Sequence, residues 1–378
     1  MDVIPAIGKF FQWKTNSLVK RSPSFKELAK VAKVSPATVT RVAKGQTNVD
    51  SEIRARVRRA AESLGIDLER KRSEKSNIVG FILANRDLLH NFQARILFGA
   101  ETYCASQDRE LLFMSFRYRP TIPAKDLALP KVVNQGNIVR AMILSGTNSA
   151  NMLAALRNRE IPFAVLGNNV LGNWNPDEYD TVYSDDIAGA RDLTTQLILQ
   201  GHRDIWFFGD IELPWYARCC EGYRQTMIQA GLRPRISEIH SDDHHLGYLA
   251  MRSVLSQGEP VTAVFAGSDQ IARGVYEAAR QSGLSIPGDI SVAGFNDSEG
   301  ALMDPPLTSV REFPEELGKH LAEFALRRIQ QPNRAVQKIV IPTKVIVRES
   351  TQPTAETGQT ALHRRSSTAL NLEKIDIR

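Results

Sequence analysis

The apolar positions of residues 24–65 repeat with the spacing of short amphipathic helices separated by polar breaks. Ser24 and Glu27 have the spacing of a capping box, which satisfies the free N–H groups at the start of a helix. After this cap, Leu28, Val31 and Ala32 fall on one helical face. The pattern predicts a first helix that buries this face against a neighbour.

A second helix is predicted after a short break. Ser35 and Pro36 suit the N-cap and the first helical position, where the missing N–H of proline costs nothing. Val39 and Val42 would face the first helix, and Gly45 suits the helix end. The outward positions are Pro36, Ala37, Thr40 and Arg41. This order favours a helix-turn-helix that enters the DNA major groove over an ordinary basic helical hairpin.

A third helix is expected over Ser51–Leu64, between Asp50 and a helix-ending Gly65. Its apolar side chains face inward, and its arginines are expected mostly outward: Arg54, Arg56, Arg58 and Arg59. The charged segment Asp67–Ser76 follows and has little that could form a core, so it reads as a linker.

From Ile78 the pattern changes to short apolar runs that alternate with helical periods. The predicted strands are Ile78–Leu83, Glu110–Phe116, Ala141–Leu144, Phe163–Leu166, Asp204–Phe208, Ala263–Ala266 and Ile290–Gly294. The predicted helices are Ala94–Ser106, Asn151–Arg159, Ile187–Gln200, Arg218–Ala230, Tyr248–Ser256 and Ser268–Ser282. Such repeats predict parallel sheets covered on both faces.

Two sets of these repeats, split near Val182, indicate an α/β body of two Rossmann-like lobes with a cleft at the strand ends. Leu307–Arg311 and Lys338–Val347 look antiparallel and are expected to return the chain between the lobes. The polar residues after Ser350 lack a heptad stripe, which favours a disordered tail.

Charge is distributed unevenly along the 378 residues. Residues 1–76 hold 17 Lys and Arg against 8 Asp and Glu, a net charge of +9 in a chain whose total is +6. A basic segment joined to a mildly acidic body suits contact with phosphates. We expect a cytoplasmic, nucleoid-associated protein, since the sequence has no signal-peptide pattern, no run of about 20 apolar residues and three cysteines that cannot all pair.

The chain resembles the lactose-repressor family of bacterial transcription regulators over almost its whole length. The stretches that carry the resemblance are Glu27–Val42, Val182–Ala190, Gly201–Ile205, Ala263–Gly274, Ile286–Asp297, Pro305–Val310 and Val347–Thr351. The resemblance implies a homodimer whose headpieces read a pseudo-palindromic DNA operator. It also implies a periplasmic-binding-protein-like body that binds a small effector, commonly a sugar or a nucleobase, between its lobes.

The expected domain organisation combines the patterns with this resemblance. It comprises an N-terminal extension (1–22), a helix-turn-helix DNA-binding domain (23–65), a charged linker (66–77), an effector-binding and dimerisation domain (78–350) and a disordered tail (351–378). The linker is about one helical turn shorter than in typical relatives and lacks their hinge-helix pattern. Leu68 is its only candidate for the leucine that relatives wedge into the minor groove.

Residues early in the second helix of a helix-turn-helix reach the base edges. Pro36, Ala37 and Arg41 are therefore the candidates for base readout, with Arg41 suited to a bidentate contact with guanine. The candidates for phosphate contacts are Ser35, Thr38, Thr40, Lys44 and Asn48.

The resemblance supplies the candidates for effector binding. Phe92 matches an aromatic position before the first helix of the body, and Ser268 and Glu312 match positions that face ligand. Asn296 stands where many sugar-binding relatives have a carboxylate, and Arg218 adjoins the usual arginine position, which Cys219 occupies. Asp185, Asp186 and Asp269 also match family positions, although each could instead cap a helix. Asp242 is expected at the edge of the cleft.

Three other functions are disfavoured by the sequence. No phosphate loop, GxGxxG turn or nucleophile elbow suggests an enzyme. His240–His245 contains three histidines, but neighbours in one loop rarely converge on one metal ion, so neither metal nor cofactor is expected. A transport binding protein would not need a helix-turn-helix. The alternative that stays open is a ligand-sensing protein with weakened or lost operator binding.

Overall fold

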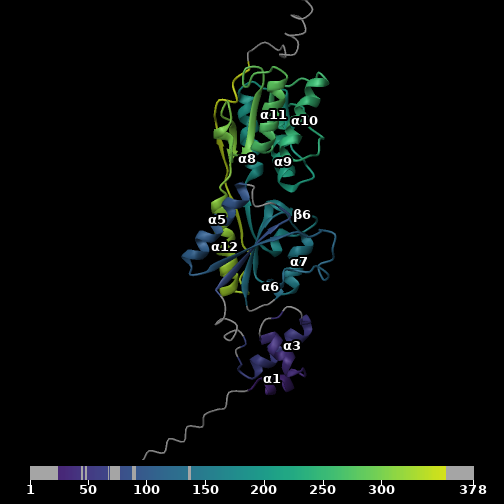
Figure 1. The fold of residues 1–378 in the computed structure, drawn as a ribbon, viewed down its shortest axis with the longest axis vertical. Coiled ribbons are helices and arrows are strands. Elements are labelled where there is room, and N and C mark those ends of the chain that lie inside the picture. Colours follow the sequence, from purple (N-terminus) through teal and green to yellow (C-terminus); the bar gives the residue numbers. More distant parts are fainter. Residues whose placement is uncertain are drawn as a thin grey trace, which may run out of the picture. The chain divides into compact units, whose positions relative to one another are not determined.

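The structure, a computed structural model, describes residues 24–43, 46, 49–66, 68, 77–86, 91–134 and 138–354. It divides into two compact units at the boundary between residues 75 and 76. Figure 1 shows their helices and strands coloured along the sequence. The expected N-terminal extension, most of the linker and the tail beyond residue 354 lie outside the described residues.

The described part of the first unit contains the helices α1 (Phe25–Val31), α2 (Pro36–Ala43) and α3 (Ser51–Ser63). The expected capping box is present, because the Ser24 N–H donates to the Glu27 carboxylate at 2.6 Å and the Glu27 N–H donates to the Ser24 hydroxyl at 3.3 Å. The Asp50 side chain caps α3. The predicted three-helix headpiece is thus the fold of this unit.

The headpiece core differs from expectation at two positions. Val31 is 51% exposed, and Ala29 is buried instead, because the packed face of α1 is centred on Leu28, Ala29 and Ala32. Arg54, expected outward, is buried because it lies three residues before Val57 on the packed face of α3.

The first lobe of the second unit is built on a parallel six-stranded sheet. In spatial order its strands are β13 (Lys338–Ile341), β7 (Asp180–Ser184), β5 (Phe163–Leu166), β3 (Val139–Gly146), β1 (Ile78–Ala84) and β2 (Glu110–Phe116). Helices α5 (Asn91–Ser106) and α12 (Pro314–Gln330) cover one face, and α7 (Ala150–Asn158) covers the other (Figure 1). Smaller elements are α6 (Lys131–Asn134), β4 (Asn148–Ser149) and β6 (Val170–Leu171).

The second lobe repeats this plan with a second six-stranded sheet. Its strands, in spatial order, are β14 (Lys344–Ile346), β12 (Thr308–Arg311), β11 (Ser291–Asn296), β10 (Ala263–Ala266), β8 (Ile205–Phe208) and β9 (Arg235–Ile236). Helices α8 (Asp186–Leu199) and α9 (Pro214–Gln229) pack on one face, and α10 (Asp243–Ser256) and α11 (Asp269–Gln281) pack on the other. Alternate residues of the strands serve the two faces, as in β8, where Phe207 and Phe208 belong to different cores.

The chain crosses between the lobes three times, after β7, after β12 and after β13. The expected antiparallel return is correct only for β14, which runs antiparallel to β12; β12 is parallel to β11, and β13 is parallel to β7. Pro342 divides the predicted strand Lys338–Val347 between two sheets, since proline cannot continue the hydrogen-bond ladder. No helix of the described part is long and apolar enough to span a bilayer.

The end of the described chain is attached to the second lobe. The Gln352 carbonyl lies 3.1 Å from the His202 ring, and the Thr354 N–H donates to the Gln200 carbonyl at 2.9 Å. Burial lowers the pKa of His202 to about 4, so its ring is neutral at physiological pH. Residues 352–354, which follow the boundary predicted at residue 350, are therefore attached to the second lobe.

Candidate functional site

The outer surface of α2 presents the side chains expected to face DNA. Ser35, Pro36, Ala37 and Arg41 are exposed, while Val39 and Val42 are buried against the other helices. The Arg41 side chain has no hydrogen-bond or ion-pair partner in the described part of the headpiece. Its guanidinium is therefore available to an acceptor outside the chain.

Two threonines of this helix already form hydrogen bonds within the headpiece. Thr38 donates its N–H to the Ser35 hydroxyl at 3.1 Å, which caps α2, and the two hydroxyls lie 2.8 Å apart. The Thr40 hydroxyl donates to the Pro36 carbonyl at 2.9 Å. Both hydroxyls retain lone pairs, so they can accept but are poorly placed to donate to a phosphate. Lys44 and Asn48 lie outside the described residues.

Leu68, the candidate minor-groove wedge, is half-buried against the headpiece core. A side chain packed in this way would have to leave its own domain before it could insert between base pairs. In this conformation the headpiece therefore presents α2, rather than Leu68, as the surface available for contact with DNA.

The second unit contains a pocket between its two lobes, with about 660 Å³ of space not filled by atoms, open solvent included. The first lobe contributes Arg86, Phe92, Gln93, Leu166, Asn168 and Asn169. The second lobe contributes Asp186, Trp215, Tyr216, Cys219, Asp243, Gly267, Ser268, Phe295, Asn296 and Glu312. Both lobes must therefore be in place for the pocket to be complete.

One carboxylate of the pocket, Asp243, is held by two hydroxyl donors. Tyr216 donates to it at 2.6 Å and Ser268 donates at 3.0 Å. Burial, together with the charge of Asp243, raises the pKa of the Tyr216 phenol well above its usual value, so Tyr216 stays a donor. Asp243 thus carries a fixed acceptor charge at the pocket wall.

A second carboxylate, Asp186, is 2% exposed and joins the lobes. It accepts from Arg218 Nε at 2.7 Å and from the Asn168 side chain of the first lobe at 2.7 Å. Burial raises its pKa, while Arg218 acts in the opposite direction. Arg218 also lies over the Tyr183 ring, 5.4 Å from its centroid, and is not among the pocket-lining residues. Arg218 is therefore engaged with the protein rather than free for a ligand.

Glu312 follows β12 at the second crossing between the lobes. Burial raises its pKa to about 8; the Asp186 and Asp269 charges act in the same direction and the Ser184 hydroxyl opposes them. At neutral pH the side chain is mostly protonated, so it can donate as well as accept a hydrogen bond.

Aromatic rings supply the apolar part of the lining. Phe92, at the start of α5, and Phe295, in β11, reach the pocket from different lobes. Trp215 lines it from α9, with the Arg86 guanidinium 4.1 Å from its ring centroid. Flat apolar surfaces beside hydrogen-bonding groups suit a compact polar molecule with apolar faces.

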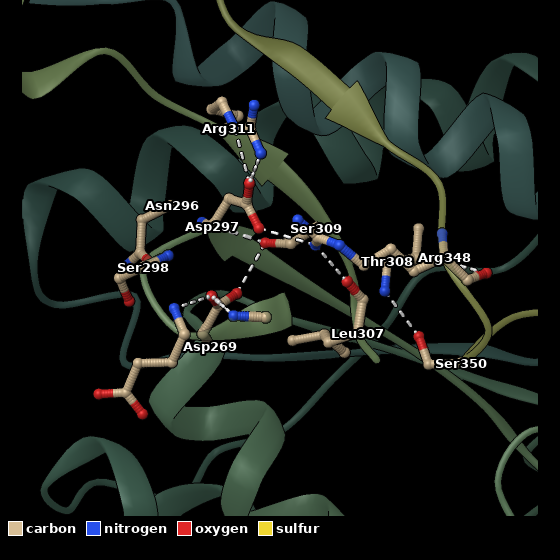
Figure 2. A network of polar contacts seen from close by, with 12 residues as sticks. Asp269, Asn296, Asp297, Ser298, Leu307, Thr308, Ser309, Arg311, Arg348 and Ser350 are labelled. Carbon is tan, nitrogen blue, oxygen red and sulfur yellow. Dashed lines mark hydrogen bonds and ion pairs between the residues drawn. The ribbon is translucent and has the colours of Figure 1, made fainter. Parts of the chain in front are cut away.

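The loop after β11 holds Asn296 at the pocket through a buried ionic network (Figure 2). Asn296 and Asp297 have φ angles of 80° and 48°, a conformation that needs support from neighbours. The Asp297 carboxylate provides it, because it lies 2.7 Å from Arg311 on one side and 2.7 Å from Arg348 on the other.

Asp269 supports the same loop from below (Figure 2). Its carboxylate accepts from the Ser309 hydroxyl at 2.6 Å and from the N–H groups of Glu299 and Gly300 at 3.0 and 2.9 Å. Burial raises its pKa to about 6. A Cβ at Gly294 would lie 2.6 Å from this carboxylate, so only glycine fits there.

The structure brings four of the eight effector candidates to the pocket: Phe92, Ser268, Asn296 and Glu312. It places Asp185, Arg218, Asp242 and Asp269 outside the lining. Asp185 and Asp242 cap α8 and α10, where their carboxylates accept from Ala188 and His245 N–H groups. In both cases the next residue, Asp186 or Asp243, lines the pocket instead.

The placement of the second aspartate of each pair, rather than the first, at the pocket has a simple physical cause. An N-cap carboxylate turns back to accept from its own helix, whereas Asp186 and Asp243, each the first residue of its helix, reach hydrogen-bond partners on other elements. Cap spacing in the sequence could have distinguished the two aspartates of each pair. Arg86, Asn168 and Asn169 carried no such signal, because they lie in loops after strands.

Two family models match the chain. The model described as bacterial regulatory proteins, lacI family, matches residues 24–66, and the model of a periplasmic binding protein-like domain matches residues 194–351. The Ribose operon repressor of Haemophilus influenzae is 30% identical over 339 residues, which cover 86% of this chain and 98% of that protein.

Two solved structures share the fold. The complex titled transcriptional regulator CelR-cellobiose superposes with a TM-score of 0.64 at 26% identity and covers 87% of this chain and 99% of that one. The lac repressor dimer bound to operator has a TM-score of 0.65 at 19% identity, with 88% and 100% coverage, a likeness of fold alone.

The α2 surface lies in the first matched segment, and the pocket lining from Trp215 to Glu312 lies in the second. The chain belongs to the lacI family of bacterial regulatory proteins and is a helix-turn-helix transcriptional regulator with a periplasmic-binding-protein-like body.

Proposed function

We propose that the protein is a repressor that binds a DNA operator as a homodimer and releases or strengthens that contact when a neutral carbohydrate enters the pocket. The observation that carries this proposal is the pocket itself, because it is lined by both lobes and adjoins the crossing at Glu312. A molecule bound to both lobes favours one lobe arrangement over others, which is the requirement for allosteric control.

On the DNA side, Pro36, Ala37 and Arg41 read base edges, and Ser35, Lys44 and Asn48 hold phosphates. The exposed, unpaired Arg41 supports this assignment for the described residues. Thr38 and Thr40 serve as acceptors from bound water or as packing groups more readily than as phosphate donors, because both hydroxyls already hydrogen-bond within the headpiece. Pairing of two headpieces is supported by the operator-bound dimer of the lac repressor.

On the effector side, the charges of the lining disfavour an anion. Asp186 and Asp243 are carboxylates, and Arg86, the cation of the lining, already stacks on Trp215. Hydroxyl groups can donate to these carboxylates and accept from Asn296, whose amide replaces a carboxylate found in sugar-binding relatives. The sugars in the names of the relatives, ribose and cellobiose, are the first probes.

The proposal is tested with the full chain and the DNA that flanks its gene. Electrophoretic mobility shifts at fixed salt measure affinity with and without D-ribose or cellobiose, and thermal shifts measure binding of each sugar. We expect one fragment to be preferred over unrelated DNA and one sugar to change that affinity. A sugar that stabilises the protein without any fragment being preferred would support the alternative of a sensor that has lost operator binding.

A further inference from the structure

A second cluster of potential ligands lies outside the pocket-lining residues, on two loops of the second lobe. Asp210 and Glu212 lie between β8 and α9, and His240 lies between β9 and α10. One donor atom from each of the three residues lies within 4.8 Å of those from the other two. Sequence alone did not join them, because about 30 residues separate the aspartate from the histidine.

The cluster is partly preorganised. Asp210 Oδ1 accepts from the Glu212 N–H at 3.1 Å and lies 2.9 Å from His240 Nδ1. The Asp210 side chain is 16% exposed, whereas that of His240 is 52% exposed, so the aspartate is held and the imidazole can rotate. In the described part of the chain, the Glu212 carboxylate has no hydrogen-bond or ion-pair partner. The imidazole therefore pairs with Asp210 and has the Glu212 carboxylate beside it, and no guanidinium or ammonium group of a described residue pairs with either carboxylate.

We propose that Asp210, Glu212 and His240 bind a Zn²⁺ ion. One imidazole nitrogen and two carboxylate oxygens are a ligand set that Zn²⁺ accepts, with water completing four-coordination. Mg²⁺ and Ca²⁺ favour sets made of oxygen alone, so the imidazole selects against them. The neighbouring His244 and His245 do not belong to the site, because they pair with Glu277 and Asp242.

The ion would fasten two loops that lead into the effector pocket. Glu212 precedes Tyr216 by four residues, and His240 precedes Asp243 by three; Tyr216 and Asp243 are hydrogen-bonded to each other at 2.6 Å within the pocket. An ion that fixes both loops also fixes this pair. Zn²⁺ therefore acts as a second ligand of the body, and it and the effector change each other's affinity by the same factor.

The test uses the full-length protein, freed of metal by a chelator and titrated with ZnCl₂ by isothermal calorimetry. We expect one ion per chain at this site, with affinity reduced at least about tenfold in Asp210→Asn and in His240→Ala. His245→Ala is the matched control, an exposed histidine five residues away, and should bind as the unmodified protein does. Circular dichroism checks the fold, and the exposed Glu212→Gln is the substitute should Asp210→Asn fail to fold.

Two results would overturn the proposal. The first is no saturable Zn²⁺ binding by the unmodified chain. The second is binding that survives Asp210→Asn and His240→Ala unchanged, which means an adventitious ion only. Neither readout requires DNA or an effector, so the metal site can fail while the proposed repressor function stands.

Discussion

The recognition helix and the effector pocket are assembled in opposite ways. The surface of α2 draws its contacts from residues 35–41, and the helix periodicity alone decides which of them face outward. The pocket draws its lining from residues 86 to 312 across two lobes and three crossings. A local surface can change one side chain at a time, whereas the pocket depends on the loops and ion pairs that hold its residues.

The charged side chains of the two regions also differ in whether they already have partners within the protein. Arg41 is exposed and without a partner in the described headpiece, ready for an external acceptor. Asp186, Asp243 and Glu312 are held by tyrosine, serine, asparagine or arginine side chains within the body. A substitution at Arg41 should therefore change DNA binding alone. A substitution at one of the pocket carboxylates should change both effector binding and the stability of the body.

The largest expected effect is a loss of stability caused by a substitution in the loop after β11, beside the pocket. Asp297→Ala leaves Arg348 and the more exposed Arg311 without their shared carboxylate, and breaking a buried ion pair such as Asp297–Arg348 costs about 3–5 kcal/mol. We expect thermal unfolding of the body at a clearly lower temperature and loss of effector binding. Glu316→Ala, which removes a surface pair with Lys319, is the control and should cost less than about 1 kcal/mol. Equal melting temperatures for the two variants would contradict the role of Asp297.

The next effect concerns the headpiece core. Leu28 is fully buried, so Leu28→Ala should destabilise the headpiece by about 2–5 kcal/mol and abolish DNA binding, while the body melts as before. Val31→Ala, at a half-exposed position of the same helix, should change stability by no more than about 0.5 kcal/mol. Calorimetric unfolding of the full chain measures both, and a shift of the body transition in Leu28→Ala would argue against independent units.

A smaller effect is expected for the recognition surface. Arg41→Ala should reduce discrimination between operator and unrelated DNA by about 1–3 kcal/mol, because alanine cannot form a bidentate contact with guanine. Effector-induced thermal stabilisation should be unchanged. Arg59→Ala, an exposed arginine of α3, is the charge-matched control and should weaken all DNA alike. Loss of effector stabilisation in Arg41→Ala would contradict the separation of the two sites.

The last effect is gradual, because it is spread over several pH units: a pH dependence of stability carried by Glu312. Burial raises its pKa to about 8 from a usual value near 4.5, so the folded state holds a proton that the unfolded state loses across this interval. The body should therefore lose stability as pH rises from about 4.5 to about 8, by at most about 1.4 kcal/mol per pH unit. Glu312→Gln should remove this component of the slope in urea unfolding followed across that range. An identical slope in the variant would exclude Glu312 as its source.

Much of the architecture could be predicted from the sequence, because apolar period and caps are local properties. The strands Glu110–Phe116, Phe163–Leu166 and Ala263–Ala266 have the predicted bounds. Helix α12 was not predicted, although its buried residues Leu317, Leu321 and Phe324 have helical spacing. The use of Lys338–Val347 by two sheets depends on distant partners that no local pattern reveals.

Part of the pocket lining could also be predicted from the sequence. Phe92, Ser268, Asn296 and Glu312 follow from family positions, and Asp186 and Asp243 could have followed from cap geometry. Arg218 was misplaced because its partner Asp186 lies 32 residues away and takes its guanidinium out of the lining. Long-range ion pairs of this kind decide which charged groups remain for a ligand.

The three passages of the chain between lobes have a consequence for biosynthesis. The first lobe needs α12 and β13, which lie between residues 314 and 341, after nearly the whole second lobe has been translated. On the ribosome, β7 has one open edge until then, and the sheet face that α5 and α12 share is covered by α5 alone. The second lobe is thus close to complete before the first can close, and the N-terminal part of the body is the part that nascent-chain chaperones would have to shield.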